Sequence, residues 1–516
     1  MKPKSSRPII LALVTFLAQT PLTATTFYIL TFSDGIAVDG SCTLREAIVA
    51  ARTDQPVDAC AAGGAEDEIV LANTGTYSFG LGHESLLDPS TRLRIRGGIP
   101  ELSELYVIDM ESANRFLQID GGANVELRNL VLENGSALTG ENGAGGALYV
   151  GDAALSVANV TVRTSEASMG GGLAFTGLGE GSLDLRNVRF LNNSAILVAA
   201  EPSYTWGGGL LISRMDTFST VLLRDVLFQG NRVQVTAPQP YALAGGMFLG
   251  LRNEGLALLE RVRFVGNGIE IGPEWGTVEG VGISIWLDDY EGIDQMPEIR
   301  MSDIQIEGNY IQGPVETALG IAMNVEVQNG PSIQVDRLEA RDHGVTPGAE
   351  LRINSFGGEV ELKNTLLVGS SARGLEVREW GYGSVRIGHL TTTGHSTEEM
   401  SLVEEGTGSI RLENSILWGD GTADLTTIGN VDLATENLIG SNPLFVDAGA
   451  GDFELLPSSP AVGSGNSTFP TVGIYDVRHR PRIVGGNTDL GALELGGLFG
   501  DGFESSDSGS WSLVEP

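Results

Sequence analysis

Positive charge is scarce in this sequence. Lysine and arginine together number 31, against 66 aspartate and glutamate residues, so the formal net charge is −35. Such a surface repels phosphate backbones, which excludes nucleic acid as an expected partner. It also disfavours anionic membranes and polyanionic substrates such as pectin, unless divalent cations mediate the contact. The uncharged alternatives, neutral polysaccharides and glycans, remain open.

Histidine and cysteine are also scarce. The five histidines are not paired at ligand spacing, so no zinc site is expected. The two cysteines, Cys42 and Cys60, favour a disulfide if the chain is exported, although two free buried thiols remain the alternative. In the chain-entropy picture, the closed loop would stabilise the fold by ~3 kcal/mol.

Long apolar runs are missing except near the N-terminus. Lys2, Lys4 and Arg7 precede an apolar stretch from Ile9 to Ala18, which is too short to span a bilayer. Small residues follow, and Leu22-Thr23-Ala24 is a passable cleavage site. We therefore predict a Sec-type signal peptide over residues 1–24, a secreted or surface-held mature protein, and no transmembrane segment.

Glycine is abundant, at 71 residues, and it punctuates a repeat. Two short alternating apolar runs flank a central residue, typified by Asn129 in Val125–Asn134. The central positions are 129, 159, 187, 225, 261, 303, 337, 364, 389 and 414. Period two predicts strands with one buried face, and a central Asn or Asp tolerates a left-handed bend. We expect these side chains to stack in a column, each amide bonding the next.

Glycines also introduce a further strand before many copies, as at Gly145, Gly171, Gly207, Gly245 and Gly280. Paired glycines permit sharp corners with positive φ. The fold class predicted is therefore all-β: a right-handed parallel β-helix of about ten or more coils, with three short strands per coil. Coils spaced at ~4.8 Å would give a rod of roughly 45–50 Å.

The repeat resembles a known family. Phe190–Asn193, Phe228–Asn231 and Phe264–Asn267 share the pattern Phe-x-x-Asn, and each is paired with a Gly-Gly-apolar strand. This combination resembles the repeats of polymorphic outer-membrane proteins. The resemblance implies a β-helix over residues 69–440 that is displayed outside the cell.

Both ends of the chain also resemble family modules. Cys42-Thr-Leu-Arg-Glu-Ala-Ile48 is similar to the CSLREA module, placed at residues 25–68. From the residues themselves, Thr43 and Glu46 form a capping box that opens a helix to about Ala51, and this helix would cover the open end of the rod. Residues 441–497 resemble the choice-of-anchor Q segment. The pieces that carry this second resemblance are Asn442–Asp447, Asp452–Leu455, Ser459–Ala461, Asp476–Arg478 and Asp489–Ala492.

An acidic, Ser/Gly-rich tail at residues 498–516 looks like the short tails of some Gram-negative secreted proteins. With the end modules, it implies a bacterial surface protein. Polar turns and closed ends argue against end-to-end stacking of rods, so a monomer is expected.

No catalytic set is predicted. Asn487-Thr-Asp489 copies a galacturonase motif but lies where no further coils follow, and His389 occupies the turn position of the repeat. Asp447–Asp452 resembles a Ca²⁺ turn without EF-hand spacing, so a structural turn is expected there and no cofactor is assigned.

Aromatic residues in the longer inserts are the candidate ligand site. Tyr204, Trp206, Tyr241 and Trp275 occupy the same corner of successive coils and should stack into one ridge. A second, long insert carries Trp286, Asp288, Asp289 and Tyr290. Aromatic faces beside acids suit neutral sugars. The alternative is that these rings only seal the apolar flank of the rod.

Two functions follow. The first is a non-catalytic surface protein in adhesion or glycan contact. The alternative is a polysaccharide-degrading enzyme, either pectate-lyase-like or a glycoside hydrolase. Carboxylates from neighbouring coils converging within ~5–9 Å in a groove would favour the enzyme.

Overall fold

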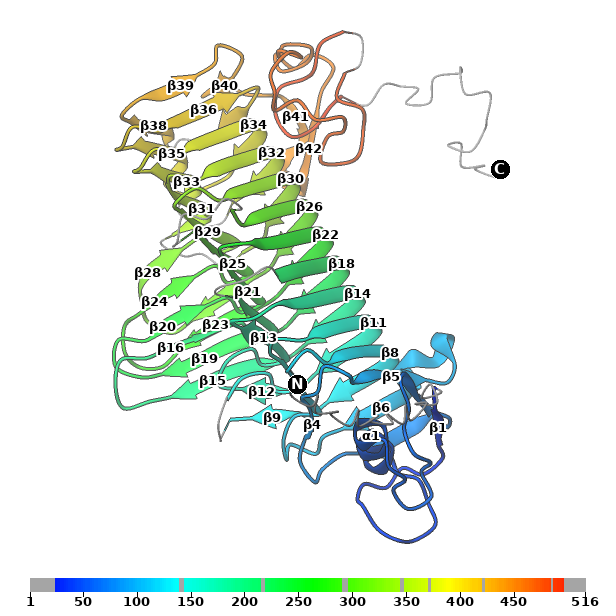
Figure 1. Ribbon diagram of the computed structural model, residues 1–516. Helices are drawn as coiled ribbons and strands as arrows, with labels where there is room; N and C mark the ends of the chain where they lie inside the picture. The colour runs from blue at the N-terminus through cyan, green and yellow to red at the C-terminus, as the bar shows by residue number, and fades with distance from the viewer. Residues whose placement is uncertain are drawn as a thin grey trace, which may run out of the picture.

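The structure is a computed structural model that describes residues 24–138, 143–214, 219–289, 296–343, 348–369, 373–419, 423–483 and 486–495. The predicted signal peptide (except Ala24), Tyr290 and the acidic tail lie outside the described residues. The strands stack into a long parallel β-helix, as predicted (Figure 1). Pairings between named strands are parallel except that of β41 (Phe445–Asp447) with β42 (Asp452–Leu455). None of the described helices is long and apolar enough to cross a membrane.

One long strand per coil forms the first sheet. Its longest members are β8 (Asn124–Glu133), β11 (Ala154–Arg163), β14 (Gly181–Leu191), β18 (Ser219–Gln229), β22 (Gly255–Val265), β26 (Glu298–Glu307), β30 (Ser332–Arg341), β32 (Glu359–Val368) and β34 (Ser384–Thr393). The predicted bend is confirmed, because the residues at all ten central positions have φ between 47° and 59°. In nine of the ten copies the two apolar runs nevertheless belong to one strand, and only around Asn414 do they form two, β36 (Ser409–Glu413) and β37 (Ile416–Trp418).

The predicted column of stacked side chains is also present. The Asn159 amide donates to Asn129 Oδ1 at 3.0 Å, and the Asn187 amide donates to Asn159 Oδ1 at 2.9 Å. In two later pairs an ion pair takes this place: Arg261 lies 2.6 Å from Asp225, and Arg337 lies 2.7 Å from Asp303.

A second sheet follows the glycine corners. Its members include β10 (Leu148–Val150), β13 (Leu173–Gly177), β17 (Leu210–Arg214), β21 (Met247–Arg252), β25 (Ile283–Asp288), β29 (Met323–Gln328), β31 (Ala349–Phe356), β33 (Arg373–Glu379), β35 (Glu398–Glu404) and β38 (Ala423–Ile428). Gly145 and Gly207 have φ of 72° and 69°, as the predicted corners require. A Cβ at Gly171 would lie 2.4 Å from Gly208 O of the next coil, so no side chain fits there.

A second asparagine column, which the sequence analysis did not predict, lies inside the rod. Asn193, Asn231, Asn267 and Asn309 are fully buried. The Asn193 and Asn231 amides each donate to the Oδ1 of the next asparagine, at 3.0 and 3.1 Å. Asn193, Asn231 and Asn267 are the asparagines of the Phe-x-x-Asn pattern, whereas Ile306 takes the place of phenylalanine before Asn309. The phenylalanines Phe190, Phe228 and Phe264 stack at 5.0 and 4.9 Å.

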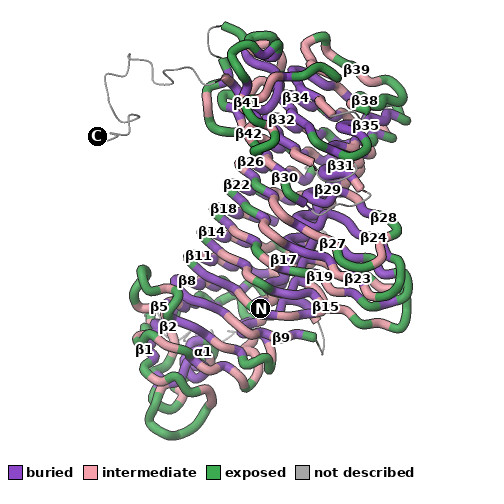
Figure 2. The backbone as a smooth tube through the Cα atoms, turned by 180° about the vertical axis from the view of Figure 1, so that it is seen from behind, coloured by how far each residue is buried: buried purple, intermediate pink, exposed green. Residues whose placement is uncertain are grey.

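The inserts of the middle coils form a lateral lobe with its own apolar core. One face consists of β15 (Ser194–Val198), β19 (Arg232–Thr236), β23 (Gly268–Ile271) and β27 (Tyr310–Gln312), and the other of β16 (Tyr204–Trp206), β20 (Tyr241–Leu243), β24 (Gly276–Glu279) and β28 (Val315–Leu319). Val233, Ile269 and Val278 pack between them. The expectation of three strands per coil is therefore wrong for the middle coils, where the inserts stack as strands of further sheets. Figure 2 shows exposed residues concentrated in the lobe turns and terminal segments.

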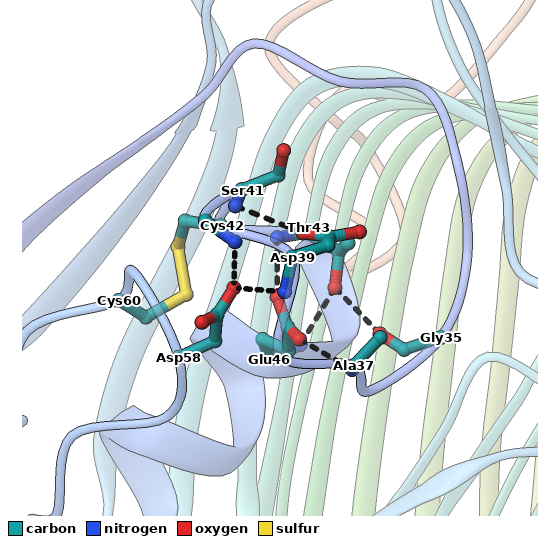
Figure 3. Close-up of a disulfide and its surroundings, with 10 residues drawn as sticks. Gly35, Ala37, Asp39, Ser41, Cys42, Thr43, Glu46, Asp58 and Cys60 are labelled. Carbon is teal, nitrogen blue, oxygen red and sulfur yellow. Dashed lines mark hydrogen bonds between the residues drawn. A yellow bond between two sulfur atoms is a disulfide. The ribbon is translucent and has the colours of Figure 1, made fainter.

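The N-terminal closure is confirmed. Helix α1 (Leu44–Thr53) begins at the predicted capping box, in which the Glu46 amide donates to Thr43 Oγ1 at 3.1 Å and the Thr43 amide donates to Glu46 Oε2 at 2.9 Å. Leu44 and Ile48 join the main core, and the Cys42–Cys60 disulfide is formed (Figure 3).

From the sequence we expected both ends of the rod to be closed. The C-terminal segment instead packs along the side of the last coils (Figure 1). Buried Arg482 donates to Asn364 Oδ1 at 2.8 Å, and the backbone N–H of Asn466 donates to Asn414 Oδ1 at 2.8 Å. The segment therefore covers the left-handed column, whose polar side chains offer partners that a bare strand edge does not.

Candidate functional site

A groove of about 510 Å³ lies where the lobe meets the second sheet. We call it the aromatic groove. Its lining consists of Tyr204, Trp206, Tyr241, Leu243, Phe248, Glu279, Ser284, Ile285, Trp286, Glu326 and Gln328. Strands β16, β20 and β24 form one wall, and β21, β25 and β29 form the other.

Strand alternation explains why this wall carries functional side chains. Ile283, Ile285 and Leu287 of β25 belong to the main core. Ser284 and Trp286 alternate with them and so face outward, toward the lobe. Trp286 pairs in register with Glu326 on the next coil.

The aromatic rings hold one another in place. The Trp206 ring lies 4.7 Å from that of Phe248 and 5.4 Å from that of Tyr204, both edge to face. The Arg252 guanidinium lies 5.4 Å from the Trp286 ring centroid. The rings are thus ordered without a ligand, which reduces the entropy lost when one binds.

The structure brings together four of the predicted site residues: Tyr204, Trp206, Tyr241 and Trp286. Trp275 lies just before β24, is 64% exposed, and does not line the groove. The predicted ridge therefore lacks Trp275. The two inserts, which the sequence analysis treated as separate, both contribute residues to this one groove.

The predicted acidic pair, Asp288 and Asp289, is buried and is not part of the groove lining. Asp288 and Asp289 are only 5% and 3% exposed, and Asp288 is the last residue of β25. It accepts a hydrogen bond of 2.9 Å from the Asn329 amide and lies 3.4 Å from Arg252. Its partners are structural, and Tyr290 lies outside the described residues.

Two other carboxyl groups, which were not predicted, lie in the groove. Glu279 ends β24 and is 7% exposed. Its Oε1 accepts from the Tyr241 hydroxyl, and its Oε2 accepts from the Asn324 amide at 3.1 Å. Burial raises the pKa of Glu279 above its usual value, and the neighbouring Glu326 adds to the rise. The pKa of Tyr241 is also raised, by burial and then by Glu279.

Glu326 has a different environment. It forms an ion pair with Arg352, and its Oε2 accepts from the Asn354 amide at 2.5 Å. The same Arg352 donates to Asn324 Oδ1 at 3.1 Å. Hydrogen bonds therefore connect Glu279 to Glu326 through Asn324 and Arg352.

An alignment of the repeat copies with one another would have indicated both Glu279 and Glu326 as groove residues. Glu279 pairs in register with Leu243, and Glu326 pairs with Trp286. Each acid thus occupies, one coil later, the position of a groove-lining apolar residue.

Comparison with known proteins identifies no relatives by sequence: no family model matches the chain, and no curated protein does. Among solved structures, the chain is similar to one described as the crystal structure of pectate lyase Pel9A. The two are 11% identical, the match covers 92% of this chain and 97% of that one, and the TM-score is 0.34. A likeness this remote assigns no activity to the chain.

The remaining candidates have structural roles. His389 is buried in the left-handed column, and burial, helped by Arg482, lowers its pKa well below the usual 6.5. Asp489 accepts from the Gly463 and Leu495 amides, each at 2.6 Å. Asp447 caps a short turn by accepting from the Ala450 amide at 3.1 Å. Within the described ranges, no three His, Cys, Asp or Glu side chains gather in a way that could hold a metal ion.

Proposed function

We propose that this protein is an exported, non-catalytic β-helix that contacts neutral polysaccharides or cell-surface glycans through the aromatic groove. The observation that carries the proposal is the joining of four aromatic side chains from successive coils with two carboxyl groups in one groove. Aromatic faces stack on the C–H faces of sugar rings, and carboxyl oxygens accept from hydroxyls.

Charge favours a neutral ligand over an acidic one. Glu279 and Glu326 line the groove, and the whole chain has a formal net charge of −35. A uronic acid polymer would meet repulsion both at the site and at long range.

Export and surface display are supported by the predicted signal peptide, by the disulfide, which forms and persists in oxidising compartments, and by the resemblance to outer-membrane repeats. On this proposal the CSLREA-like segment is the front closure of a Gram-negative surface protein, and the choice-of-anchor Q-like segment lies toward its point of attachment.

Binding is tested with a glycan array, followed by calorimetric titration of the neutral glycan that binds best. Trp206→Ala and Trp286→Ala should each weaken binding about tenfold, since a lost stacking contact is worth on the order of 1.4 kcal/mol. Trp275→Ala is the matched control, because this exposed tryptophan lies beside the lobe but outside the groove. Equal affinities of all three variants and the unaltered protein would place the site elsewhere.

A further inference from the structure

The second sheet continues beyond the aromatic groove, one coil at a time. Gln328 of β29 lines the groove, and it pairs in register with Phe356 of β31. The ladder then reaches the end of β33, where the Trp380 N–H donates to Ser355 O at 3.1 Å. Strands β31 and β33 follow β25 and β29 along the rod (Figure 1). Phe356 and Trp380 therefore belong to the two coils that come directly after those of the groove.

Strand alternation turns both rings away from the main core. Ile353 of β31 and Val377 of β33 belong to that core. Phe356 and Trp380 each follow three residues later, so alternation places them on the outward face of the sheet. This is the face on which Trp286 lines the groove.

Phe356, Trp380 and Tyr382 form what we call the second ring cluster. The Phe356 ring centroid lies 4.7 Å from that of Trp380 and 6.1 Å from that of Tyr382. Trp380 is 45% exposed and Tyr382 is 60% exposed. Gly357 has a φ of 88°, and a Cβ there would lie 2.4 Å from Tyr382 Cζ, so the tyrosine ring packs directly on the glycine backbone. The cluster thus presents two rings to solvent that neighbouring groups already hold in place, which lowers the entropy cost of binding.

The Tyr382 ring borders a hollow of about 680 Å³ that is rich in hydroxyl groups. Its lining includes Ser332, Glu359, Ser384 and Ser409, which pair in register at the start of successive long strands. These groups exchange hydrogen bonds with sugar hydroxyls. Among the described residues that line the hollow there is no lysine or arginine, so an acidic sugar would find no cation there.

The sheet surface between the groove and the second ring cluster carries charges that neutralise one another. Arg352 forms ion pairs with Glu326 and with Glu376, the latter at 3.8 Å. Arg373 pairs with the same Glu376, and it lies 2.8 Å from Glu398. The arginines on this surface are thus already occupied by carboxylates of the chain, and the surface favours a neutral ligand over a polyanion.

We propose that the second ring cluster is a further sugar-binding subsite, and that it and the aromatic groove together bind one linear neutral polysaccharide chain lying along the rod. The inference rests on the proposed glycan binding by the groove, and it specifies the ligand as an extended chain rather than a short glycan. Trp286 on β25 and Trp380 at the end of β33 are separated by three coil steps. At ~4.8 Å per coil this is about 14 Å, and sugar units of about 5 Å each would let a chain of about four sugars reach both rings.

Calorimetric titration of the full chain with dimers and hexamers of β-linked glucose, mannose and xylose tests the inference. The best-binding hexamer should bind about tenfold more tightly than its dimer, because only the hexamer gains the second stacking contact. Trp380→Ala should remove this gain and leave dimer affinity within about twofold of the unaltered protein, whereas Trp380→Phe keeps a ring and should retain most of it. Trp275→Ala, which removes an exposed tryptophan outside the groove, is the matched control and should change neither affinity.

The outcomes separate the subsite from the groove. Dimers that bind as tightly as hexamers, or a Trp380→Ala protein that binds hexamers unchanged, would overturn the second subsite and leave groove binding intact. Equal weakening of dimer and hexamer in Trp380→Ala would also overturn it, because a ligand too short to reach the subsite should not depend on it. Absence of binding to all of these neutral oligomers would overturn the proposed function as well.

Discussion

At the scale of single residues, the rod depends on polar side chains that repeat from coil to coil. A left-handed residue bends each long strand. In several neighbouring coils its side chain bonds the equivalent residue: amide to amide at Asn129 and Asn159, and guanidinium to carboxylate at Arg261 and Asp225. The chemical groups that form this contact therefore differ from one pair of coils to another. Asn and Asp adopt left-handed φ more readily than other residues with a Cβ, whereas Arg261 and Arg337 adopt it here while paired with Asp225 and Asp303.

Asn231→Ala should destabilise the β-helix by about 2–4 kcal/mol, because the change leaves several buried groups unpaired. Asn231 donates to Phe190 O at 2.8 Å and to Asn267 Oδ1, and it accepts from the Asn193 amide. Chemical unfolding measures the loss. Gln229→Ala, two residues away and exposed, is the control and should change stability by less than about 0.5 kcal/mol. Equal midpoints for the two variants would refute a supporting role for the asparagine column.

Glu494 should make the docking of the C-terminal segment sensitive to pH. Burial raises its pKa from 4.5 to about 7, although Arg482 opposes the rise. A carboxyl whose pKa is higher in the folded state binds protons there preferentially. Stability therefore falls as pH rises from about 4.5 to about 7, by up to about 3 kcal/mol.

Unfolding of Glu494→Gln near pH ~5 and near pH ~8 tests this, since glutamine cannot ionise and should remove the loss. Glu405→Gln, at an exposed position, should retain it. The same pH dependence in Glu494→Gln would exclude Glu494 as its source.

At the scale of elements, the N-terminal cap joins a short helix to the first coils through side chains. Arg45 of α1 contacts Asp34 and Glu84 at 2.7 and 2.8 Å, and it lies 4.0 Å from the Phe79 ring centroid. The disulfide joins Cys42, just before this helix, to Cys60 in the segment that follows it. The cap thus covers apolar residues of the first coil that would otherwise meet water.

Removing the disulfide with the double substitution Cys42→Ser and Cys60→Ser should lower stability by ~3 kcal/mol, given the loop of 18 residues. Thermal unfolding with and without reductant should show the same decrease for the unaltered protein and no effect of reductant on the variant. Identical melting of reduced and oxidised protein would show that the helix is held by its packing alone.

The sequence predicts the elements whose pattern is local. Period-two runs around position 129 and its equivalents gave the long strands, and Thr43 with Glu46 gave the helix start. The lobe was not predicted as sheets, because strands as short as Tyr204–Trp206 are too brief to show a period. Of the site, the sequence predicted four aromatic residues: Tyr204, Trp206, Tyr241 and Trp286. Glu279 and Glu326 were not, because their meeting depends on register between coils and on burial, which no single segment encodes.

At the scale of the whole molecule, a long acidic rod carries its lobe on the middle coils (Figure 1). The formal net charge of −35 acts on any charged ligand before contact, whereas a neutral ligand is affected only within the groove. Ionic strength therefore distinguishes the two ligand classes.

Affinity for the bound neutral glycan should change less than about twofold between ~0.05 M and ~0.5 M salt, since its contacts are uncharged. Polygalacturonate should bind more weakly than the neutral glycan at low salt, and added salt should narrow the difference. Titrations at both salt concentrations measure this. Tighter binding of the polyanion at low salt would contradict the assignment of a neutral ligand.

The central claim is that the aromatic groove is where this protein meets a glycan. Hydrogen exchange of the full chain, measured with and without the neutral disaccharide that binds best, tests it most directly. The account predicts protection confined to β16, β20, β24, β21, β25 and β29, whose side chains line the groove. Protection at the long-strand sheet or the C-terminal segment, with these six strands unchanged, would contradict it.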